Sequence, residues 1–264
     1  MTAPSPPSGA ADPLAGTPPM TARSVLASAL MGEEPPELPV AHLVPLAGLF
    51  GINPNRARVA LSRMVASGEA TTDGAGRYRL AGHLLERRDR QGDSLAGRTR
   101  GWDGGWHLVV VTTTGRSAEQ RTARRRRLSL ARLAEQREGV WLRPDNLDLH
   151  PDPADDGDLA VFTAVPDADP AVLAASLWDL DGWATRARLL VDAIEARPTA
   201  GRDDLARGFA LSAAVLRHLQ ADPLLPAALV PDDWPGPALR ATYAGWDRRY
   251  REVLRAWGRT IRST

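Results

Sequence analysis

Apolar residues recur at helical spacing in three consecutive segments near the start of the chain, with a glycine after each. These segments are residues 21–31, 40–50 and 53–67. The third begins with Asn53-Pro54, in which Asn is a preferred N-cap and Pro favours the first helical turn. Residues 70–80 then contain two short β-prone stretches around Asp73-Gly74, a typical hairpin turn. The order helix, helix, helix, hairpin predicts a winged helix-turn-helix over residues 21–82.

A different alternation follows in the middle of the chain. Three apolar stretches have the length of strands, at residues 106–112, 139–142 and 159–165. An Arg-rich segment of helical character lies between the first two, at residues 117–137. The order strand, helix, strand, strand predicts a small ferredoxin-like α+β module over residues 106–168. The polar, Gly-rich residues 83–105 that precede this module are expected to form a linker.

The last third of the chain has the apolar spacing of helices. They are expected near residues 170–178, 182–196, 202–221 and 237–261. Together they predict a helical C-terminal domain over residues 169–264. Residues 1–20 are rich in Pro, Ala, Gly and Ser and are expected to be a disordered tail. The predicted fold class is therefore α+β, with a winged helix-turn-helix, a ferredoxin-like module and a helical domain in that order.

The predicted helix at residues 53–67 has two different faces when each residue is rotated by about 100° from the one before it. One face is apolar and consists of Ala57, Ala60, Leu61, Met64 and Val65. The opposite face is small at its centre and is bordered by arginines: it contains Asn55, Val59, Ser62 and Ala66, flanked by Arg56, Arg58 and Arg63. Such a face can approach the floor of the major groove of DNA closely, although arginines also occur on ordinary solvent-exposed helix faces.

Each polar residue type on this face has a partner in DNA. Asn suits adenine, Arg suits guanine and Ser reaches either a base or a phosphate, while an Arg farther along the helix suits a phosphate. On the predicted hairpin, Arg77 and Arg79 alternate with Tyr78 and therefore share one side of the strand. The candidate DNA-binding residues are Asn55, Arg56, Arg58, Ser62, Arg63, Arg77 and Arg79.

Charge is distributed unevenly along the 264 residues, although the net charge is only +1. All 33 basic residues are Arg, whose planar guanidinium suits phosphates and guanine edges. Residues 21–100 contain 11 Arg against 8 acidic residues, whereas residues 152–170 contain 6 Asp and no basic residue. This pattern favours a local contact with nucleic acid over a polycationic surface.

Several functional classes lack their sequence signatures. The chain has no Cys, no apolar run long enough to cross a membrane and no signal-like start, so we expect a cytoplasmic protein that does not contact membranes. The histidines are scattered without the spacing of zinc ligands: they are His42, His83, His107, His150 and His218. The motifs of a nucleophile elbow and of a phosphate-binding loop do not occur. We therefore expect no catalytic residues, metal or cofactor.

Motifs along most of the chain resemble the PaaX family of phenylacetic acid catabolism repressors. The N-terminal motifs are SVLASALMG at 24–32, GINPNRARVALSRMVASGE at 51–69 and RYRL at 77–80. The later motifs are GWDGGWHLVVV at 101–111, GVWLRPDNL at 139–147, LWDLDGW at 177–183 and DPLLPAALVPDDWPGPALR at 222–240. Their order and spacing carry the resemblance, which extends over residues 20–261.

The resemblance implies a transcriptional repressor that binds an inverted-repeat DNA operator as a homodimer. It implies repression of phenylacetic acid or related aromatic catabolism, relieved by an acyl-CoA such as phenylacetyl-CoA. It also implies a central module similar to small CRISPR-associated nucleases, so one alternative is a metal-dependent nuclease that acts through that module. A second alternative is a regulator of a different acyl-CoA pathway, and a third is an adaptor that binds another protein.

An acyl-CoA effector needs cationic groups for its phosphates and an apolar slot for its acyl group. The densest basic run could supply the cations, and it consists of Arg121, Arg124, Arg125, Arg126 and Arg127. The same run is equally explained as a solvated helix face or a second contact with the DNA backbone. Four tryptophans could line the slot or belong to the core, namely Trp178, Trp183, Trp234 and Trp246. The sequence does not show where an effector would bind.

Overall fold

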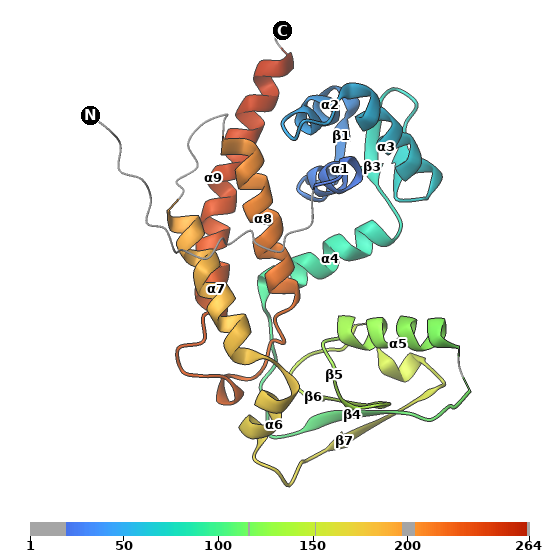
Figure 1. The fold of residues 1–264 in the computed structure, drawn as a ribbon, viewed down its shortest axis with the longest axis vertical. Coiled ribbons are helices and arrows are strands. Elements are labelled where there is room, and N and C mark those ends of the chain that lie inside the picture. Colours follow the sequence, from blue (N-terminus) through green and yellow to red (C-terminus); the bar gives the residue numbers. More distant parts are fainter. Residues whose placement is uncertain (1–19, 116, 151, 197–203, 263–264) are drawn as a thin grey trace. The chain divides into compact units, whose positions relative to one another are not determined.

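The computed structural model describes residues 20–115, 117–150, 152–196 and 204–262 (Figure 1). The expected disordered tail at residues 1–20 lies, except for Met20, outside the described residues. The chain divides into two compact units. The first contains Met1–Ala96, Arg186–Gln220 and Ala238–Thr264, and the second contains Gly97–Thr185 and Ala221–Pro237.

The first unit begins with three helices and a small antiparallel sheet. The elements are α1 (Ala22–Met31), β1 (Glu37–Pro39), α2 (Val40–Gly48), α3 (Pro54–Ala66), β2 (Ala70–Thr72) and β3 (Arg77–Leu80). The strand order is β1-β3-β2, so β3 lies in the centre. The predicted helices and hairpin are present, and the arrangement is consistent with a winged helix-turn-helix. Strand β1, which pairs with β3, was not predicted from the sequence.

Side-chain caps and apolar burial explain why these helices form where they do. Thr21 and Ser24 form a capping box at the start of α1, and the Asn53 side chain accepts a hydrogen bond from the backbone of Arg56 at the start of α3. The interior of this region is apolar, and its completely buried side chains include Val25, Leu26, Leu30, Leu43, Ala57 and Leu61. Each fully buried Val or Leu side chain contributes about 1.5–3 kcal/mol.

Helix α4 (His83–Ala96) occupies the first part of the segment expected to be a linker. Its sequence is strongly polar, and only Leu84 and Ser94 are buried, which is why the pattern resembles a linker. The structure nevertheless anchors it at both ends: Arg88 donates to the carbonyl oxygens of Met31 and Glu33, and Arg240 donates to that of Ser94. Backbone carbonyls that accept these bonds cannot be recognised in a sequence.

The helices of the last third occur close to the expected positions. They are α6 (Pro170–Leu177), α7 (Leu180–Glu195), α8 (Leu205–Gln220) and α9 (Gly236–Arg262). They do not group as the single helical domain expected over residues 169–264. Helix α8 and all but the first two residues of α9 belong to the first unit. Helix α6 and the segment 221–237 belong to the second unit. The reason is that α6 buries Leu173 and Ala174 in the core of the second unit.

The second unit is built on one antiparallel sheet of four strands. Its further elements are β4 (Trp106–Val111), α5 (Ala118–Leu130), β5 (Ala134–Arg137), β6 (Val140–Pro144), the short helices η1 (Pro153–Asp155) and η3 (Ala227–Leu229), and β7 (Leu159–Ala164). The strand order is β5-β6-β4-β7, with every neighbouring pair antiparallel. This is the antiparallel strand order of a ferredoxin-like sheet. The helix that follows the first strand, here α5, connects β4 to the edge strand β5 on the far side of β6.

The helix predicted over residues 117–137 is wrong in its last part, because α5 ends at Leu130. Arg132 adopts a left-handed backbone conformation with φ 61°, which stops the helix. Residues 134–137 then form β5, and Gly139, with φ 77°, turns the chain into β6. Hairpin pairing with β6 therefore overrides the helical composition of this segment.

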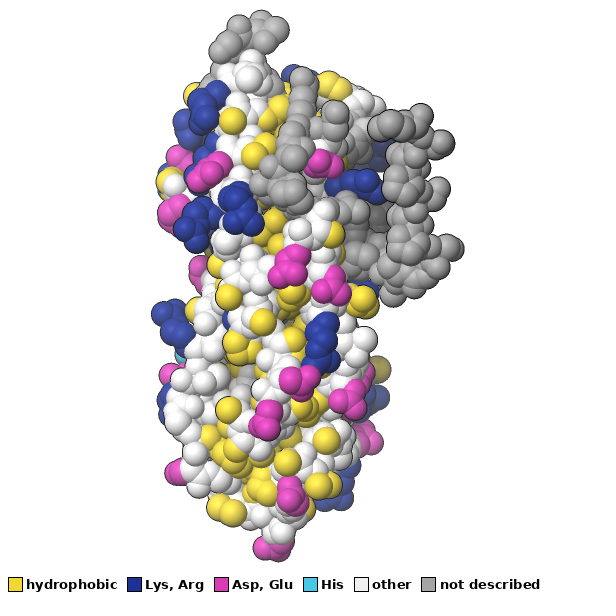
Figure 2. All heavy atoms as spheres, turned by 90° about the vertical axis from the view of Figure 1, so that its left-hand side faces the viewer, with side chains coloured by type: hydrophobic (Ala, Val, Ile, Leu, Met, Phe, Trp, Pro, Cys, Tyr) yellow, Lys and Arg dark blue, Asp and Glu magenta, His cyan; other side chains and the backbone are white. Residues whose placement is uncertain are grey.

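Each face of the sheet buries its own apolar cluster. Under α5 the cluster consists of Val109, Leu128, Ala131, Leu133, Trp141 and Leu159. On the other face, beside α6 and η3, it consists of Trp106, Leu142, Leu173, Ala174 and Leu229. On the face of the molecule shown in Figure 2, apolar side chains are also exposed over the part that carries α6. Large exposed apolar residues of this unit include Phe162, Val165 and Val172.

One arginine is completely buried in the second unit. Arg143 donates to the carbonyl oxygens of Pro144 and Arg132, and its Nη2 lies 2.8 Å from Oδ1 of Asn146. Burial, together with repulsion from Arg132, lowers the pKa of Arg143 to about 9. Asn146 in turn donates to the carbonyl oxygen of Leu224 at 2.8 Å, so the pair ties β6 to the segment 221–237.

We expect Asn146→Ala to lower the free energy of unfolding by about 2–4 kcal/mol, since it leaves the Arg143 guanidinium and the Leu224 carbonyl without this partner in a buried place. Urea denaturation measures the change. The control is Asp148→Ala at an exposed position nearby, for which we expect a change within about 0.5 kcal/mol. Equal stabilities of the two variants would contradict this role of Asn146.

Candidate nucleic-acid interface

Helix α3 packs on α1 and α2 through a narrow apolar face and leaves the rest of its surface open (Figure 1). Ala57, Leu61 and Met64 are buried, while Ala60 and Val65 are only partly buried. The face that packs inward is therefore the apolar face predicted from the sequence, and the residues at its edges, Ala60 and Val65, are less deeply buried.

All five candidate residues on α3 are exposed: Asn55, Arg56, Arg58, Ser62 and Arg63. Between them, Val59 is 42% exposed at the centre of the outer face. Among the residues that the structure describes, no acidic side chain forms an ion pair with Arg56, Arg58 or Arg63. Each of these guanidinium groups is thus available for an anionic or hydrogen-bonding partner outside the chain.

The two candidate arginines on the hairpin have an acidic neighbour that the sequence pattern missed. Glu37 on β1 lies opposite Arg79 on β3, and its side chain pairs with both Arg77 and Arg79. The shortest N–O distances are 3.3 Å to Arg77 and 2.6 Å to Arg79. The only sequence signal for this contact was a two-residue stretch between prolines, too short to indicate a strand. The wing therefore presents less positive charge than its two arginines suggest.

The turn of the hairpin is held by Asp73. Its Oδ1 accepts hydrogen bonds from the backbone of Ala75 at 2.8 Å and of Arg77 at 2.9 Å. These bonds, that from Arg77 foremost, lower the pKa of Asp73 below its ordinary value. Gly74 has φ 77°, a conformation that glycine adopts without strain. The turn is therefore a preformed local structure, as its sequence predicted.

A bidentate ion pair fixes α1 to the segment that follows α3. Arg23 on α1 donates through Nε to Glu69 at 2.7 Å and through Nη2 to the second carboxylate oxygen. Glu69 lies three residues after the end of α3, is buried, and donates its backbone N–H to the carbonyl oxygen of Met64. The hydrogen bonds from Arg23 hold the pKa of Glu69 below its ordinary value. Sequence spacing does not indicate this pair, because its partners are separated by 46 residues.

Three family models match the chain in sequence order. The model of the PaaX-like protein matches residues 21–84, the PaaX protein central Cas2-like domain matches residues 99–152, and the PaaX-like protein C-terminal domain matches residues 178–259. The chain belongs to the PaaX-like family. This is a family of transcriptional regulators rather than enzymes. The first match contains the whole candidate interface.

One solved structure has a similar sequence and fold. This PaaX-like chain is similar to the uncharacterized protein Rv0674 from Mycobacterium tuberculosis, with 41% sequence identity and a TM-score of 0.71. The similarity covers 89% of this chain and 98% of the other. No match to this chain was found among curated proteins.

Two arginines of α5 and the four candidate tryptophans have partners within the chain. In the Arg-rich helix α5, Arg125 pairs with Glu135 at 3.0 Å and Arg127 pairs with Asp156. The tryptophans pack as core residues: Trp183 stacks on Trp234 with ring centres 4.6 Å apart, and buried Trp246 stacks on Tyr250 at 5.0 Å. Trp178 packs against the cluster around Trp106. For these four tryptophans the core interpretation fits the PaaX-like chain.

Within the described ranges, no three His, Asp or Glu side chains come together as a group that could hold a metal ion. No helix among the described residues is both long and apolar enough to cross a membrane.

We expect Glu69→Gln to lower the free energy of unfolding by about 1–2 kcal/mol at neutral pH, since Arg23 loses a charged bidentate partner and is itself half exposed. The pKa of Glu69 is lowered by folding, so its contribution is present above the unfolded value of about 4.3 and is lost as the pH falls through the lower folded value. The difference in the free energy of unfolding between wild type and variant, measured by urea denaturation, should therefore shrink as the pH falls from 6 to about 3. A difference that stays constant over this range would contradict the role of the ion pair.

Proposed function

We propose that this protein is a DNA-binding transcriptional regulator whose helix α3 enters the major groove of double-stranded DNA. The observation that supports this most is the outer face of α3, where three exposed arginines without an acidic partner among the described residues surround small side chains. This face belongs to the part of the chain that matches the PaaX-like family model. Helices α1 and α2 support α3 from behind, as a groove-reading helix requires.

The residues divide into two roles by their position. Asn55, Arg56 and Arg58 lie in the first turns of α3 and read base edges, with Asn suited to adenine and Arg to guanine. Ser62 contacts a base or a phosphate. Arg63, farther along the helix, contacts a phosphate and helps to fix the register of the protein on DNA. Arg77 and Arg79 approach the DNA backbone as the wing, within reach of Glu37.

The protein acts as a homodimer on an inverted-repeat operator, and it works in the cytoplasm. Two α3 helices then enter major-groove faces one helical turn of DNA, roughly 34–36 Å, or a multiple of it apart. The repressor controls genes of phenylacetic acid or related aromatic catabolism, and an acyl-CoA such as phenylacetyl-CoA releases it. For this release the effector binds the DNA-free state more tightly, and DNA weakens effector binding by the same factor.

Fluorescence anisotropy on the DNA upstream of the protein's own gene tests this proposal. The protein is titrated onto the labelled duplex and onto a random duplex at one fixed salt concentration, because both affinities depend on salt. We expect the specific duplex to bind at least about 10³-fold more tightly. Phenylacetyl-CoA is then added to the complex, with phenylacetate in a parallel titration.

Each result bears on a different part of the proposal. Release by the thioester alone supports both the regulator and its effector. Specific binding that ignores phenylacetyl-CoA keeps the regulator and assigns it to a different acyl-CoA pathway. Equal affinity for the specific and random duplexes, on this DNA and on the regions upstream of neighbouring catabolic genes, would contradict the regulator.

Arg58→Ala is expected to weaken operator binding by about 1–3 kcal/mol, or roughly 5- to 150-fold, because a guanine loses its bidentate partner. Binding to the random duplex should change much less. Arg207→Ala on α8 is the matched control, since Arg207 is also exposed and lies far from α3 in the sequence. If both variants bind the operator like the wild type, Arg58 is not a base-reading residue.

Glu37→Gln should strengthen binding to both duplexes severalfold, because it frees Arg77 and Arg79 and removes a negative charge from the wing. The slope of the logarithm of affinity against the logarithm of salt concentration should become steeper. Glu252→Gln on α9 removes the same charge elsewhere and controls for net charge. Unchanged affinity and slope in Glu37→Gln would place the wing away from DNA.

A further inference from the structure

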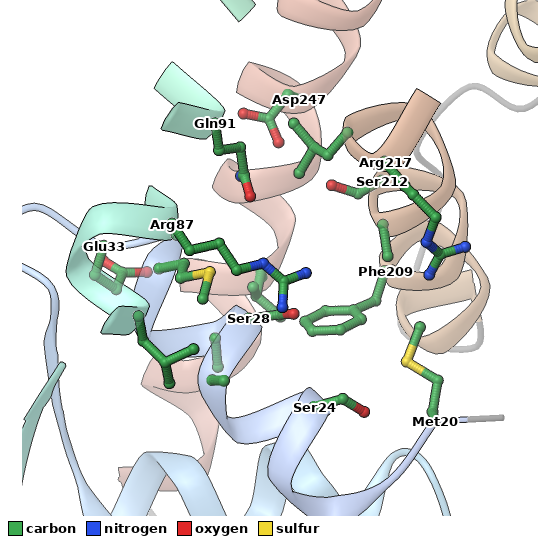
Figure 3. Close-up of a pocket in the computed structure, with 18 of the residues that line it drawn as sticks. Met20, Ser24, Ser28, Glu33, Arg87, Gln91, Phe209, Ser212, Arg217 and Asp247 are labelled. Atoms are coloured by element: carbon green, nitrogen blue, oxygen red, sulfur yellow. The ribbon is translucent and has the colours of Figure 1, made fainter. Parts of the chain in front are cut away.

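A cavity of about 340 Å³ lies within the first unit, between α1, α4, α8 and α9 (Figure 3). Its residues come from segments far apart in the sequence, from Met20 to Leu254. Volumes of this size are at the lower end of the range for small-molecule sites, roughly 300–1,000 Å³. The cavity is therefore large enough for a small organic molecule or for one part of a larger one.

Part of the cavity wall is apolar and fixed in place. Leu84, Leu216 and Leu254 contribute aliphatic surface. Phe209 lies in the centre of the view in Figure 3 and packs edge-on against Phe50, with ring centres 5.0 Å apart. Because Phe209 is held by this contact and is only 8% exposed, it offers a preformed aromatic surface.

The charged part of the wall has a surplus of cations. It contains four arginines and two carboxylates, namely Arg23, Arg87, Arg217 and Arg251 with Glu33 and Asp247. Arg23 is bound to Glu69, and Arg251 is bound to Asp247 at 2.6 Å. Within the described ranges no acidic side chain forms an ion pair with Arg87 or Arg217. In Figure 3 the Arg87 side chain extends from α4 toward Phe209, and the Arg217 side chain lies along α8 on the other side of Phe209.

These cations also repel one another. Burial and the nearby charges of Arg217, Arg23 and Arg90 lower the pKa of Arg87. A protein gains nothing for its own stability by placing such groups together without a counter-ion. An anion between the two guanidinium groups would offset the repulsion and receive charge-assisted hydrogen bonds, the strongest type available to it.

We propose that this cavity binds an organic anion, with its carboxylate or phosphate between Arg87 and Arg217 and its apolar body against Phe209 and Leu216. The side chain of Gln91 at the wall provides a further hydrogen-bonding group. The volume accommodates a small aryl or alkyl carboxylate, or one end of a coenzyme A thioester, but not such a thioester as a whole.

Occupation of the cavity affects the DNA-binding part directly, because α1 forms one wall. Helix α1 supports α3 and is bound to its end through Arg23 and Glu69. A ligand that draws Arg87 on α4 and Arg217 on α8 together changes the surroundings of α1 and so the position of α3. This regulatory consequence rests on the proposed function, whereas anion binding does not.

The site is tested on the full-length protein without DNA, with 8-anilinonaphthalene-1-sulfonate as the probe. This fluorescent molecule combines an aromatic body with one anionic group, as the cavity requires. Titrations compare the wild type with Arg87→Gln, Arg217→Gln and the control Arg207→Gln, which removes an exposed arginine from the same helix as Arg217 but outside the cavity.

We expect saturable binding to the wild type and the control, and binding about tenfold weaker in each cavity variant, because each loses one charge-assisted hydrogen bond. Thermal melts of the cavity variants should not fall below that of the wild type, since each removes a repulsive charge. No saturable binding to the wild type, or equal affinity in all four proteins, would overturn the proposal.

Displacement of the bound probe then identifies the source of the anion. Displacement by phenylacetate supports a free carboxylate as the ligand, whereas displacement by phenylacetyl-CoA and not by phenylacetate supports the thioester. Coenzyme A alone shows whether the phosphate end is sufficient. Displacement from the wild type and the Arg207→Gln control that is weakened in both cavity variants supports the site for either source.

The same proteins on the operator separate the two proposals. If the wild type binds no DNA specifically, the proposed function fails while the probe result on free protein still decides the site. If the ligand releases the wild type and the Arg207→Gln control but not Arg87→Gln or Arg217→Gln, the cavity is the regulatory site. Equal release of all four proteins would overturn the regulatory role.

Discussion

Helix α1 buries Val25, Leu26 and Leu30 completely, and the first unit is organised around this burial. The helix contacts α2, α3, α4 and β3, so it supports the candidate recognition helix on one side and the following helix on the other. Two polar contacts extend this arrangement: Arg23 reaches Glu69 at the end of α3, and Arg251 of α9 reaches the carbonyl of Gly32. Because interiors are closely packed, a change at α1 is transmitted to α3 rather than absorbed.

Arginine serves three different purposes in this chain, and its surroundings decide which. Arg143 is buried and bound to carbonyls and an amide, where it ties segments of the second unit together. Arg77 and Arg79 share the carboxylate of Glu37, which moderates the charge of the wing. Other arginines have no acidic partner among the described residues. Arg58 is one of them on the outer face of α3, and Arg87 is another at the cavity.

The sequence predicted most of the elements because their signals are local. The Asn53 cap, the apolar spacing of α3 and the Asp73-Gly74 turn are each determined within a few residues, and all three are present. Two expectations failed, one at a hairpin and one where arginines bond to distant backbone carbonyls. Residues 134–137 follow a helical pattern yet pair with β6, and the polar segment expected as a linker forms α4 because Arg88 and Arg240 anchor it.

For the candidate interface, the sequence alone determined which residues α3 exposes, because one helical turn fixes its two faces. It also carried the resemblance to a family of DNA-binding repressors. Only the tertiary structure decided which arginines have partners, since Glu37 and Arg79, like Arg23 and Glu69, are separated by more than 40 residues. The cavity likewise exists only because four helices from both ends of the chain pack together. Packing brings together side chains that are far apart in the sequence, and such contacts produce no periodic pattern in the sequence itself.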